Sequence, residues 1–473
     1  MTELDRRAFL RRSASLAGSA ILAPSLAGLV ACSRPVCGAA PVRMRASNGS
    51  YGELVPSKEC PELWIPRGFN CMRLSQSMMP MKSGGGLVPP GMDGMAAFRL
   101  PNRNVRLIRN HEIGEPADIS KVIGDPGRSY DSKGGGGTSS LEVRIGRDGR
   151  PELLAEFISL SGTLINCAGG PTPWGSWITC EETTWGEAQG RDRDHGYCFE
   201  VPASATSEVT PVPLKAMGRF VHEAVAVDAN TGIVYLTEDM LYSFEDPETL
   251  PGAGFYRFIP TRRGELAAGG RLQMLAVTGQ PRFNTILGQI PFRPMAVSWI
   301  DIADPDPAAA EWDPSALART GQAAGGAIFQ RLEGCFYADG TIYFDATKGG
   351  NAAAGQVWQY RPTGPDTGEL TLIFESPSKD VLDSPDNICV SPRGGLVICE
   401  DGDDVQFVRG LTTRGTIFDV ARTVSANATE FAGACFSPDG RVLFFNQQGS
   451  RFYSGTAVGT TYALYGPWEE GAL

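Results

Sequence analysis

Short apolar runs recur in pairs along most of the chain, and the two runs of a pair are separated by a turn rich in Gly, Pro, Asp or Asn. A polar residue, usually a carboxylate or an amide, stands at each end of the pair. Short runs with β-branched and aromatic residues, joined by tight turns, predict β-hairpins. The copies span residues 93–112, 166–182, 222–239, 333–347, 386–401 and 430–448.

Repeated hairpins are typical of β-propellers, in which four-stranded blades surround a channel lined by the starts of the innermost strands. We therefore predict an all-β fold, a six-bladed β-propeller with loop insertions, formed as a single catalytic domain by residues 63–465. Residues 33–62 would lead into this domain, and residues 466–473 would form a tail. Long helical periodicity is absent, and the 58 Gly and 34 Pro of the chain suit many tight turns.

The first 32 residues have the order of an export signal. Arg6 and Arg7 precede an apolar pair, and small and apolar residues follow from Ala14 to Ala31. This order predicts a secretory signal of the twin-arginine type over residues 1–32. A membrane anchor is the alternative, but a span needs about 20 apolar residues and this run is only weakly hydrophobic.

Residues 29–32 (LVAC) resemble the bacterial lipobox, whose cysteine is lipidated after cleavage of the signal. Two interpretations stay open: Cys32 carries a lipid anchor, or the match arose by chance in a stretch rich in small residues. Either way, we expect the protein in the periplasm or cell envelope, or secreted, with the twin-arginine translocation machinery as its partner during export.

The formal net charge of −11 makes nucleic acid an unsuitable partner, because phosphate binding needs basic stripes that this chain lacks. Most of the 53 carboxylates are expected to be ordinary solvated surface groups. The carboxylates at the hairpin ends differ, because their spacing follows the hairpins. We expect a monomer that acts on a small molecule.

Acidic residues converging on one channel would repel one another, and bound cations would relieve this repulsion. The chain has three histidines, too few for a His-rich zinc or copper centre. Oxygen ligands select hard cations such as calcium, or ferric iron if a thiolate joins them. The candidate oxygen donors are Asp93, Glu112, Glu181, Glu182, Glu223, Glu238, Asp239, Glu333, Asp386, Asn387, Glu400, Asp401 and Glu430.

Cys167 differs from the other ten cysteines because it opens a hairpin and precedes Ala168, Gly169 and Gly170, which permit close approach of the backbone. It is either a thiolate ligand of a transition metal or a buried thiol. No CxxC pair exists, which argues against a zinc ribbon. Cys389 and Cys399, on adjoining strands of one hairpin, are either a disulfide or free buried thiols.

No Gly-x-Ser-x-Gly elbow, P-loop or dinucleotide-binding fingerprint appears in a supporting context. The basic residues beside the acidic hairpin ends are few: Arg109, Arg219, Arg331 and Lys348. Each is either a counter-ion for neighbouring carboxylates or, next to a metal cluster, a clamp for a phosphoryl group.

Several separated motifs resemble those of the PhoX-type alkaline phosphatase family. They are Arg109-Asn110-His111-Glu112, Asn166-Cys167-Ala168-Gly169-Gly170 with Thr172-Pro173-Trp174-Gly175 and Glu181-Glu182, His222-Glu223, Arg331-x-Glu333-Gly334, Asp386-Asn387, and Phe436-Ser437-Pro438-Asp439-Gly440. The resemblance runs from about Leu63 to Gln448. It implies a β-propeller whose channel holds Fe³⁺ and Ca²⁺ bridged by an oxo group and which hydrolyses phosphate monoesters outside the cytoplasm.

Matched by motif, the resemblance implies that Cys167 is the thiolate ligand of iron and that Arg331 holds the substrate phosphate. Arg331, Cys167 and Glu333 would form the catalytic set. The metals would neutralise phosphoryl oxygens while a bridging oxo or hydroxide group attacks phosphorus in line. The predicted metal ligands are Cys167, Glu112, Glu181, Glu182, Glu223, Glu238, Glu333, Asp386 and Glu400.

Two alternatives stay open. A calcium-dependent propeller lactonase or esterase would use a similar acidic axis on a carbon ester, although it would not need the thiolate of Cys167. A non-catalytic envelope binding propeller would keep the fold, and it would show neither bound iron nor turnover.

Overall fold

The structure, a computed structural model, describes residues 47–114, 121–426, 428–450 and 457–473, all within the compact unit of residues 42–473. The predicted signal over residues 1–32 and Cys32 lie outside the described residues. Over the ranges just given, no helix is both long enough and apolar enough to cross a membrane.

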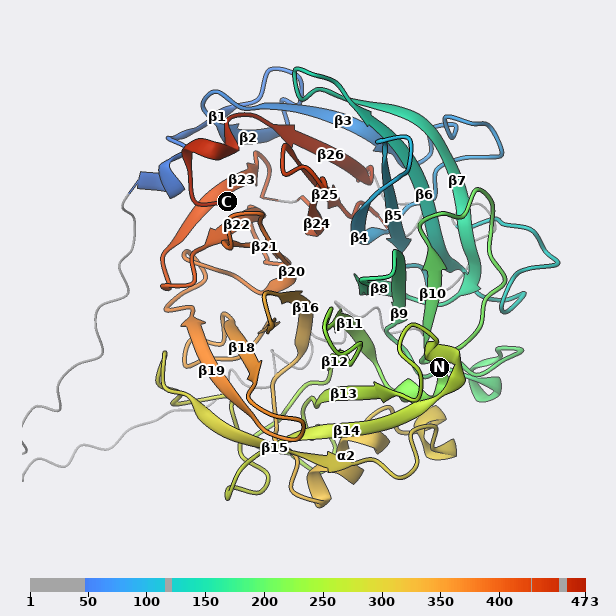
Figure 1. The fold of residues 1–473 in the computed structure, drawn as a ribbon, viewed down its shortest axis with the longest axis vertical. Helices are drawn as coiled ribbons and strands as arrows, with labels where there is room; N and C mark the ends of the chain where they lie inside the picture. Colours follow the sequence, from blue (N-terminus) through green and yellow to red (C-terminus); the bar gives the residue numbers. More distant parts are fainter. Residues whose placement is uncertain (1–46, 115–120, 427, 451–456) are drawn as a thin grey trace, which may run out of the picture. The chain divides into compact units, whose positions relative to one another are not determined.

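Antiparallel strands make up most of the described chain (Figure 1). The first sheet contains β4 (Met92–Arg99), β5 (Val105–His111), β6 (Gly136–Ile145) and β7 (Pro151–Thr163). The second contains β8 (Asn166–Pro171), β9 (Ser176–Glu181) and β10 (Cys198–Pro202). In both sheets the chain runs outward from the centre of Figure 1, strand after strand.

A nine-stranded sheet follows. Its first half is β11 (His222–Val227), β12 (Val234–Glu238), β13 (Phe255–Pro260), β14 (Gly270–Val277) and β15 (Met295–Asp301). Its second half is β16 (Leu332–Ala338), β17 (Thr341–Ala346), β18 (Gln356–Pro362) and β19 (Gly368–Glu375). Strand β15 pairs with both β14 and β19, so it joins the two halves at their outer edges.

Two further sheets contain strands from both ends of the described chain. One contains β20 (Pro385–Val390), β21 (Leu396–Glu400), β22 (Phe407–Leu411), β23 (Ile417–Thr423), β2 (Leu63–Pro66) and β1 (Leu54–Pro56). The other contains β24 (Phe431–Phe436), β25 (Val442–Gln447), β26 (Thr460–Tyr465) and β3 (Asn70–Gln76). The early strands β2 and β3 therefore complete sheets built from the last strands.

Helices are short. The single α-helix of the described residues is α2 (Ala316–Ala323). The 3-10 helices are η1 (Ser47–Ser50), η2 (Glu187–Gln189), η3 (Lys215–Met217), η4 (Leu266–Ala268), η5 (Ala308–Glu311) and η6 (Trp468–Glu470).

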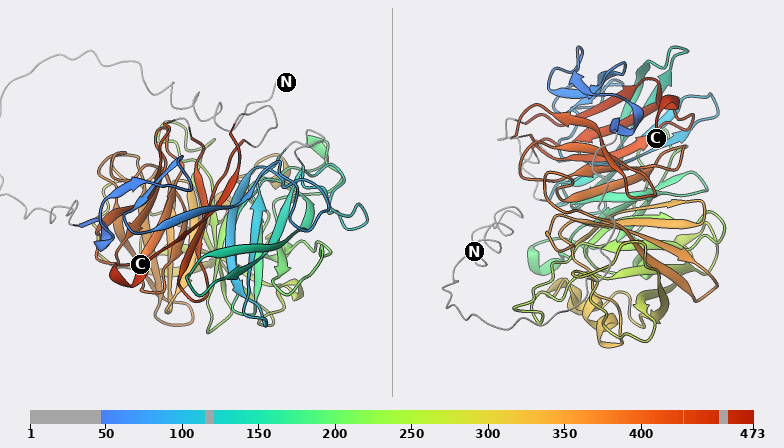
Figure 2. Two further views of the ribbon diagram at one scale, coloured as in Figure 1. Left: turned by 90° about the horizontal axis from the view of Figure 1, so that it is seen from above. Right: turned by 90° about the vertical axis from the view of Figure 1, so that its left-hand side faces the viewer.

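The innermost strands are β4, β8, β11, β16, β20 and β24 (Figure 1). They contact one another in this order, and β24 contacts β4 again, so they close a ring. The sheets stand side by side with their strands inclined (Figure 2). The predicted all-β, propeller-like fold is confirmed. The hydrogen-bonded sheets do not form six separate blades, because β15 links two of the expected blades into one sheet.

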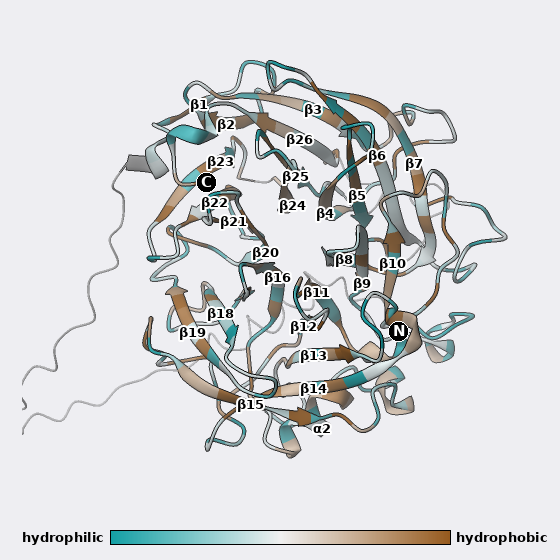
Figure 3. Ribbon diagram, viewed as in Figure 1, coloured by the Kyte–Doolittle hydropathy of each residue, from teal (hydrophilic) through white to brown (hydrophobic). Residues whose placement is uncertain are grey.

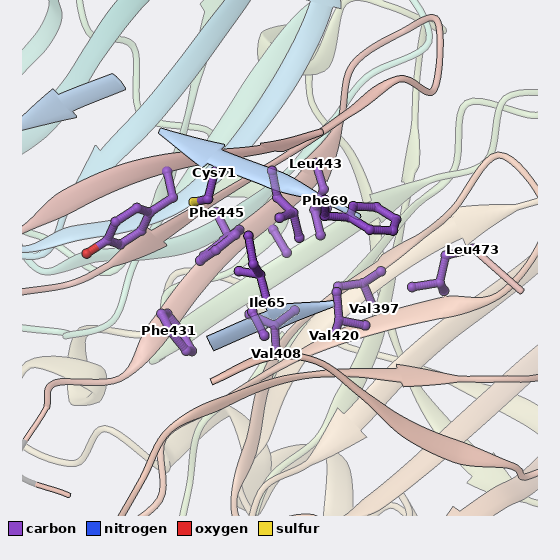
Figure 4. Packing of buried hydrophobic residues seen from close by; sticks show 14 of the residues in the cluster. Ile65, Phe69, Cys71, Val397, Val408, Val420, Phe431, Leu443, Phe445 and Leu473 are labelled. Carbon is purple, nitrogen blue, oxygen red and sulfur yellow. The ribbon is translucent and has the colours of Figure 1, made fainter. Parts of the chain in front are cut away.

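Many residues of the strands are apolar, drawn in brown in Figure 3, and buried apolar side chains of neighbouring sheets pack together in clusters. In the cluster of Figure 4, Phe431 and Phe445 of one sheet pack with Val397 and Val408 of the next. Leu473 is also buried there, and Tyr51 Oη donates a hydrogen bond of 2.9 Å to its carbonyl. Residues outside the predicted 63–465 range therefore contribute to this core.

Small residues lie where the innermost strands meet. A Cβ added at Gly94 would stand 2.6 Å from Ala168 Cα, and one added at Gly334 would stand 2.5 Å from the Asp386 carbonyl oxygen. In both cases the obstacle is backbone, which cannot swing aside. The ring can therefore close only with minimal side chains at these positions.

We predict that Gly94→Ala destabilises the protein by roughly 1–3 kcal/mol, because overpacking must push β4 and β8 apart. Urea denaturation measures the change. The control is Gly127→Ala, since a Cβ at this exposed position would meet only the Asp125 carboxylate, at 3.3 Å. Equal stability of the two variants would contradict close packing of the ring.

Candidate metal centre

Each hairpin that starts in the ring has an irregularity in its pairing register close to the beginning of its inner strand. The shifts fall between Met92 and Met95, Asn166 and Gly169, His222 and Val225, Leu332 and Cys335, Pro385 and Ile388, and Ala432 and Cys435. Such bulges re-aim side chains and are frequent next to active sites. The first residue inside each shift, here called a bulge residue, is Asp93, Cys167, Glu223, Glu333, Asp386 or Gly433.

The residues that directly follow the bulge residues line one common pocket on the axis. They are Gly94, Ala168, Ala224, Gly334, Asn387 and Ala434. Their convergence places the bulge residues around the same axis.

A second set of residues follows the second strand of each hairpin. The main-chain N–H of each donates to a carbonyl just before the inner strand of the same hairpin, with N···O distances of 2.7 to 3.1 Å. These rim residues are Glu112, Glu182, Asp239, Thr347, Asp401 and Gln448, and their acceptors belong to Gly91, Ile165, Val221, Arg331, Ser384 and Glu430. Bulge and rim residues therefore lie next to each other in every hairpin.

Bulge and rim side chains form three overlapping groups in which the ligand atoms all lie within 4.8 Å of one another. The groups are Asp93 with Glu112 and Cys167, Cys167 with Glu182 and Glu223, and Glu223 with Glu333 and Asp386. Cys167 and Glu223 each belong to two groups. We call these seven residues the axial cluster, and all of them are buried.

The axial cluster is electrostatically costly without cations. Burial, together with the negative charges of Glu333, Glu182 and other acids, holds the pKa of Glu223 well above its usual range. Burial and the neighbouring acids also raise the pKa values of Asp93, Asp386 and the Cys167 thiol. The Cys167 thiol donates to Glu223 Oε1 at 3.0 Å, which shares a proton between two potential ligands.

The donor set fits a metal ion. Within the described part of the chain, the buried atoms Asp93 Oδ1 and Glu223 Oε2 have no hydrogen-bond partner. Unsatisfied buried oxygens are expensive, and a cation would satisfy both them and the surplus negative charge. Six carboxylates and one thiol suit hard cations together with a metal that accepts sulfur.

The ring is not acidic all the way round. The sixth hairpin has Gly433 as its bulge residue and Gln448 at its rim. The Gln448 amide donates to Asp93 Oδ2 at 2.9 Å and to Glu112 Oε2 at 2.5 Å. This neutral donor holds one side of the axial cluster in place without adding charge.

Arg331 lies directly beside the axial cluster. Its guanidinium binds Asp239 through two hydrogen bonds of 2.8 Å and Glu333 Oε1 through one of 2.7 Å. Its backbone has φ +47°, and Ile165 and Ser384, at the same position before their bulge residues, have φ +46° and +55°. A left-handed conformation is strained for residues other than glycine, and such strain clusters at functional sites.

Three of the predicted metal ligands, Glu181, Glu238 and Glu400, belong to none of the three groups. Each ends its second strand, one residue before a rim residue, and successive side chains of a strand point to opposite faces. Tyr256 Oη and the Gly254 N–H donate to Glu238, and Arg409 Nε donates to Glu400. Burial raises the pKa of Glu238 to about 8 and that of Glu400 to about 7.

Glu181 is enclosed in a separate buried network. It accepts hydrogen bonds from the main chain of Leu164, Gly196 and Tyr197, and its Oε1 lies 2.6 Å from His195 Nδ1. On its other side, His195 Nε2 lies 3.3 Å from Asp131 Oδ2. The structure therefore brings Cys167, Glu112, Glu182, Glu223, Glu333 and Asp386 together and places Glu181 in another environment.

Asp93 was a candidate oxygen donor but was missing from the predicted ligand set. The signal that could have pointed to it is a dipeptide: Asp93-Gly94, Cys167-Ala168, Glu223-Ala224 and Glu333-Gly334 all pair a candidate ligand with a small residue at a hairpin start. The bulge explains this pattern, because one residue faces the axis and the next meets a neighbouring strand.

The cysteines of the described residues are free and buried, Cys389 and Cys399 included. Cys389 and Cys399 are therefore buried thiols in this structure and do not form the disulfide that was the other interpretation. Burial raises the pKa values of both.

Comparison with known proteins identifies the family. Residues 49–450 match the model of the family "Alkaline phosphatase PhoX", so the chain belongs to the alkaline phosphatase PhoX family. Among solved structures, Pseudomonas fluorescens PhoX in complex with vanadate has a TM-score of 0.65 and 17% identity, covering 89% of this chain and 99% of that chain. No curated protein matches the sequence.

A gluconolactonase from Xanthomonas campestris is similar at a TM-score of only 0.42 and 14% identity, covering 88% of this chain and 98% of that chain.

The network around Glu181 predicts pH-dependent stability. Burial alone would lower the pKa of His195, but Glu181 and Asp131 outweigh it and raise this pKa to about 9. A folded-state pKa above the unfolded value of about 6.5 adds stability below pH 6.5 that is lost as the pH rises through about 9. We predict that His195→Gln is less stable than the parent by roughly 2–3 kcal/mol at pH 6, and that the gap narrows by pH 9.5. Urea denaturation in excess chelator measures it, and a gap independent of pH would contradict a charged His195.

Repulsion between the acids of the axial cluster predicts a variant that is more stable than the parent protein. Because the pKa of Glu223 is raised, its contribution to the stability of metal-free protein is lost as the pH rises past about 4.3. We predict that Glu223→Gln stabilises metal-free protein at pH 8 by roughly 1–3 kcal/mol while weakening calcium binding.

Denaturation in excess chelator and calcium titration measure the two effects, with the exposed Glu248→Gln as control. A Glu223→Gln protein less stable than its metal-free parent would contradict the repulsion.

Proposed function

We propose that this protein is an exported phosphatase that hydrolyses phosphate monoesters with Fe³⁺ and Ca²⁺ held by the axial cluster. Membership of the alkaline phosphatase PhoX family supports the phosphatase activity. The observation that carries the metal-dependent part is the convergence of Cys167 with six carboxylates at the centre of the ring. A solved relative is described in complex with vanadate, a transition state analogue, which supports a phosphoryl substrate.

We further propose that the ring is a six-bladed propeller. On this interpretation the nine-stranded sheet is two four-stranded blades that share β15 as an outer link. The closed circuit of the innermost strands supports this count. Export by the twin-arginine route and a final place in the periplasm or cell envelope are inferred from the sequence of residues 1–32 alone.

The ligands divide by chemistry. A thiolate prefers iron to calcium, so Cys167 and its group partners Glu182 and Glu223 would hold iron. The all-oxygen group of Glu223, Glu333 and Asp386 suits calcium, and Asp93 with Glu112 would serve an ion next to Cys167. When bound, these ions would neutralise phosphoryl oxygens and lower the pKa of the attacking water.

The protein side chains would supply orientation. We assign Arg331 to the substrate phosphate, since its guanidinium lies at the edge of the axial cluster and is already oriented by Asp239 and Glu333. Because the guanidinium is already held in one orientation, it would lose little conformational freedom on binding two phosphate oxygens through a pair of hydrogen bonds. With water as the nucleophile, no serine elbow would be needed, consistent with its absence from the sequence.

We predict that Cys167→Ala loses bound iron, the colour of a sulfur-to-iron charge-transfer band and at least 100-fold in phosphomonoester hydrolysis. Cys435→Ala is the control, because Cys435 is a buried strand cysteine outside the axial cluster. Elemental analysis, absorbance and hydrolysis of a chromogenic phosphomonoester measure the three effects. Calcium chelation should stop turnover of the parent separately.

An iron-loaded, fully active Cys167→Ala protein would contradict the assignment of Cys167. A parent that turns over lactones instead of phosphomonoesters would contradict the phosphatase assignment.

A further inference from the structure

Buried side chains from one hairpin hydrogen-bond the main chain at the bulge of the next hairpin. Asn110 Nδ2 donates to the carbonyls of Cys167 and Ala168, at 3.1 and 2.7 Å. Thr237 Oγ1 donates to the Glu333 carbonyl at 2.5 Å, and Asn446 Nδ2 donates to the Asp93 carbonyl at 2.6 Å. Three of the bulge residues in the axial cluster are therefore tied to a neighbouring hairpin.

These donors occupy equivalent positions. Asn110, Thr237 and Asn446 each lie two residues before a rim residue, on the second strand of their hairpins, and none of the three is exposed to solvent. A bulge leaves an extra residue unpaired in its own ladder, and a buried carbonyl needs a donor. The neighbouring hairpin supplies it in the same way three times.

Each donor is itself held in one orientation. Trp177 Nε1 donates to Asn110 Oδ1 at 2.8 Å, and Thr461 Oγ1 donates to Asn446 Oδ1 at 2.6 Å. The Ala224 N–H donates to Thr237 Oγ1 at 3.0 Å. The oxygen of each side chain thus accepts a hydrogen bond, which turns its donor group toward the bulge carbonyl. The one proton of the Thr237 hydroxyl has two acceptors within reach, and the Glu333 carbonyl at 2.5 Å is closer than the Ala224 carbonyl at 3.2 Å.

We propose that Asn110, Thr237 and Asn446 are positioning residues, which fix the backbone of Cys167, Glu333 and Asp93 and so set the spacing of the axial cluster across hairpins. They touch neither cation nor substrate. Groups that do not bind a metal themselves commonly orient the residues that do, and we assign this role to the three side chains. The proposal rests on the proposed function only in assuming that the axial cluster holds cations.

Thr237 allows the sharpest test. It contacts Ala224, which follows Glu223, and also the carbonyl of Glu333, so one hydroxyl joins two bulges of the same three-carboxylate group. Thr237→Val keeps the shape of the side chain and removes only the hydrogen bonds. Thr285→Val is a matched control, because Thr285 is equally buried and donates to the main-chain carbonyl of Ile328, at 2.9 Å, outside the axial cluster.

The experiment is calorimetric titration of chelator-treated protein with calcium chloride, alongside urea denaturation of the same samples. We expect Thr237→Val to weaken calcium binding 10- to 100-fold, as the loss of an orienting group behind a metal ligand does. Thr285→Val should lose comparable stability and keep the affinity of the parent. Thr237→Ser, which restores the hydroxyl, should recover most of the affinity.

Thr237→Cys keeps the test decisive if Thr237→Val does not fold, because Cys180 and Cys399 occupy the corresponding positions in two other hairpins. Its weak S–H donor should give an intermediate affinity. Parent-like calcium binding by Thr237→Val or Thr237→Cys, or an equal loss in Thr285→Val, would overturn the proposal. A parent that binds calcium without hydrolysing phosphomonoesters would instead contradict the proposed function and leave this test intact.

Discussion

Carboxylates that face one another across a narrow buried axis repel, and this constraint governs the centre of the molecule. Six carboxylates and a thiol come together there, because the bulges turn Asp93, Cys167, Glu223, Glu333 and Asp386 toward the axis and the rim adds Glu112 and Glu182. Burial removes the water that would otherwise screen them, so their pKa values rise. The ring of strands therefore supports an arrangement that is stable only with protons or cations on the axis.

The surroundings of the axis serve this constraint. Small residues such as Gly94 and Gly334 let the inner strands approach, and Arg331 and Gln448 bring donors to the acids at the edge. Twin-arginine export, which we propose, would carry a folded chain, so cations could be bound before the protein leaves the cytoplasm. Folding and metal loading would then be coupled.

Much of this organisation could be read from the sequence. Each of the predicted hairpins is present, because alternating apolar runs and tight turns are local signals. The placement of Cys167, Glu223 and Glu333 in linked groups also follows from their position at hairpin starts. The link through β15 could not be predicted, because pairing between β15 and β19 joins segments far apart in the chain.

The ligand set shows the same limit at the scale of single residues. Glu181 and Glu182 are neighbours in sequence, yet Glu181 pairs with His195 away from the axis and Glu182 joins the axial cluster. A one-residue difference in strand phase decides between them, and that phase depends on where the strand ends. The bulge that turns Asp93 toward the buried axis likewise cannot be predicted from a simple alternation of polar and apolar positions.

The most direct test of the account is a crystal structure of the protein purified with its metals, with anomalous diffraction measured on both sides of the iron absorption edge. The account predicts an iron peak directly beside Cys167 Sγ and oxygen-coordinated density among Glu223, Glu333 and Asp386. An axis without metal density, or iron bound away from Cys167, would contradict it.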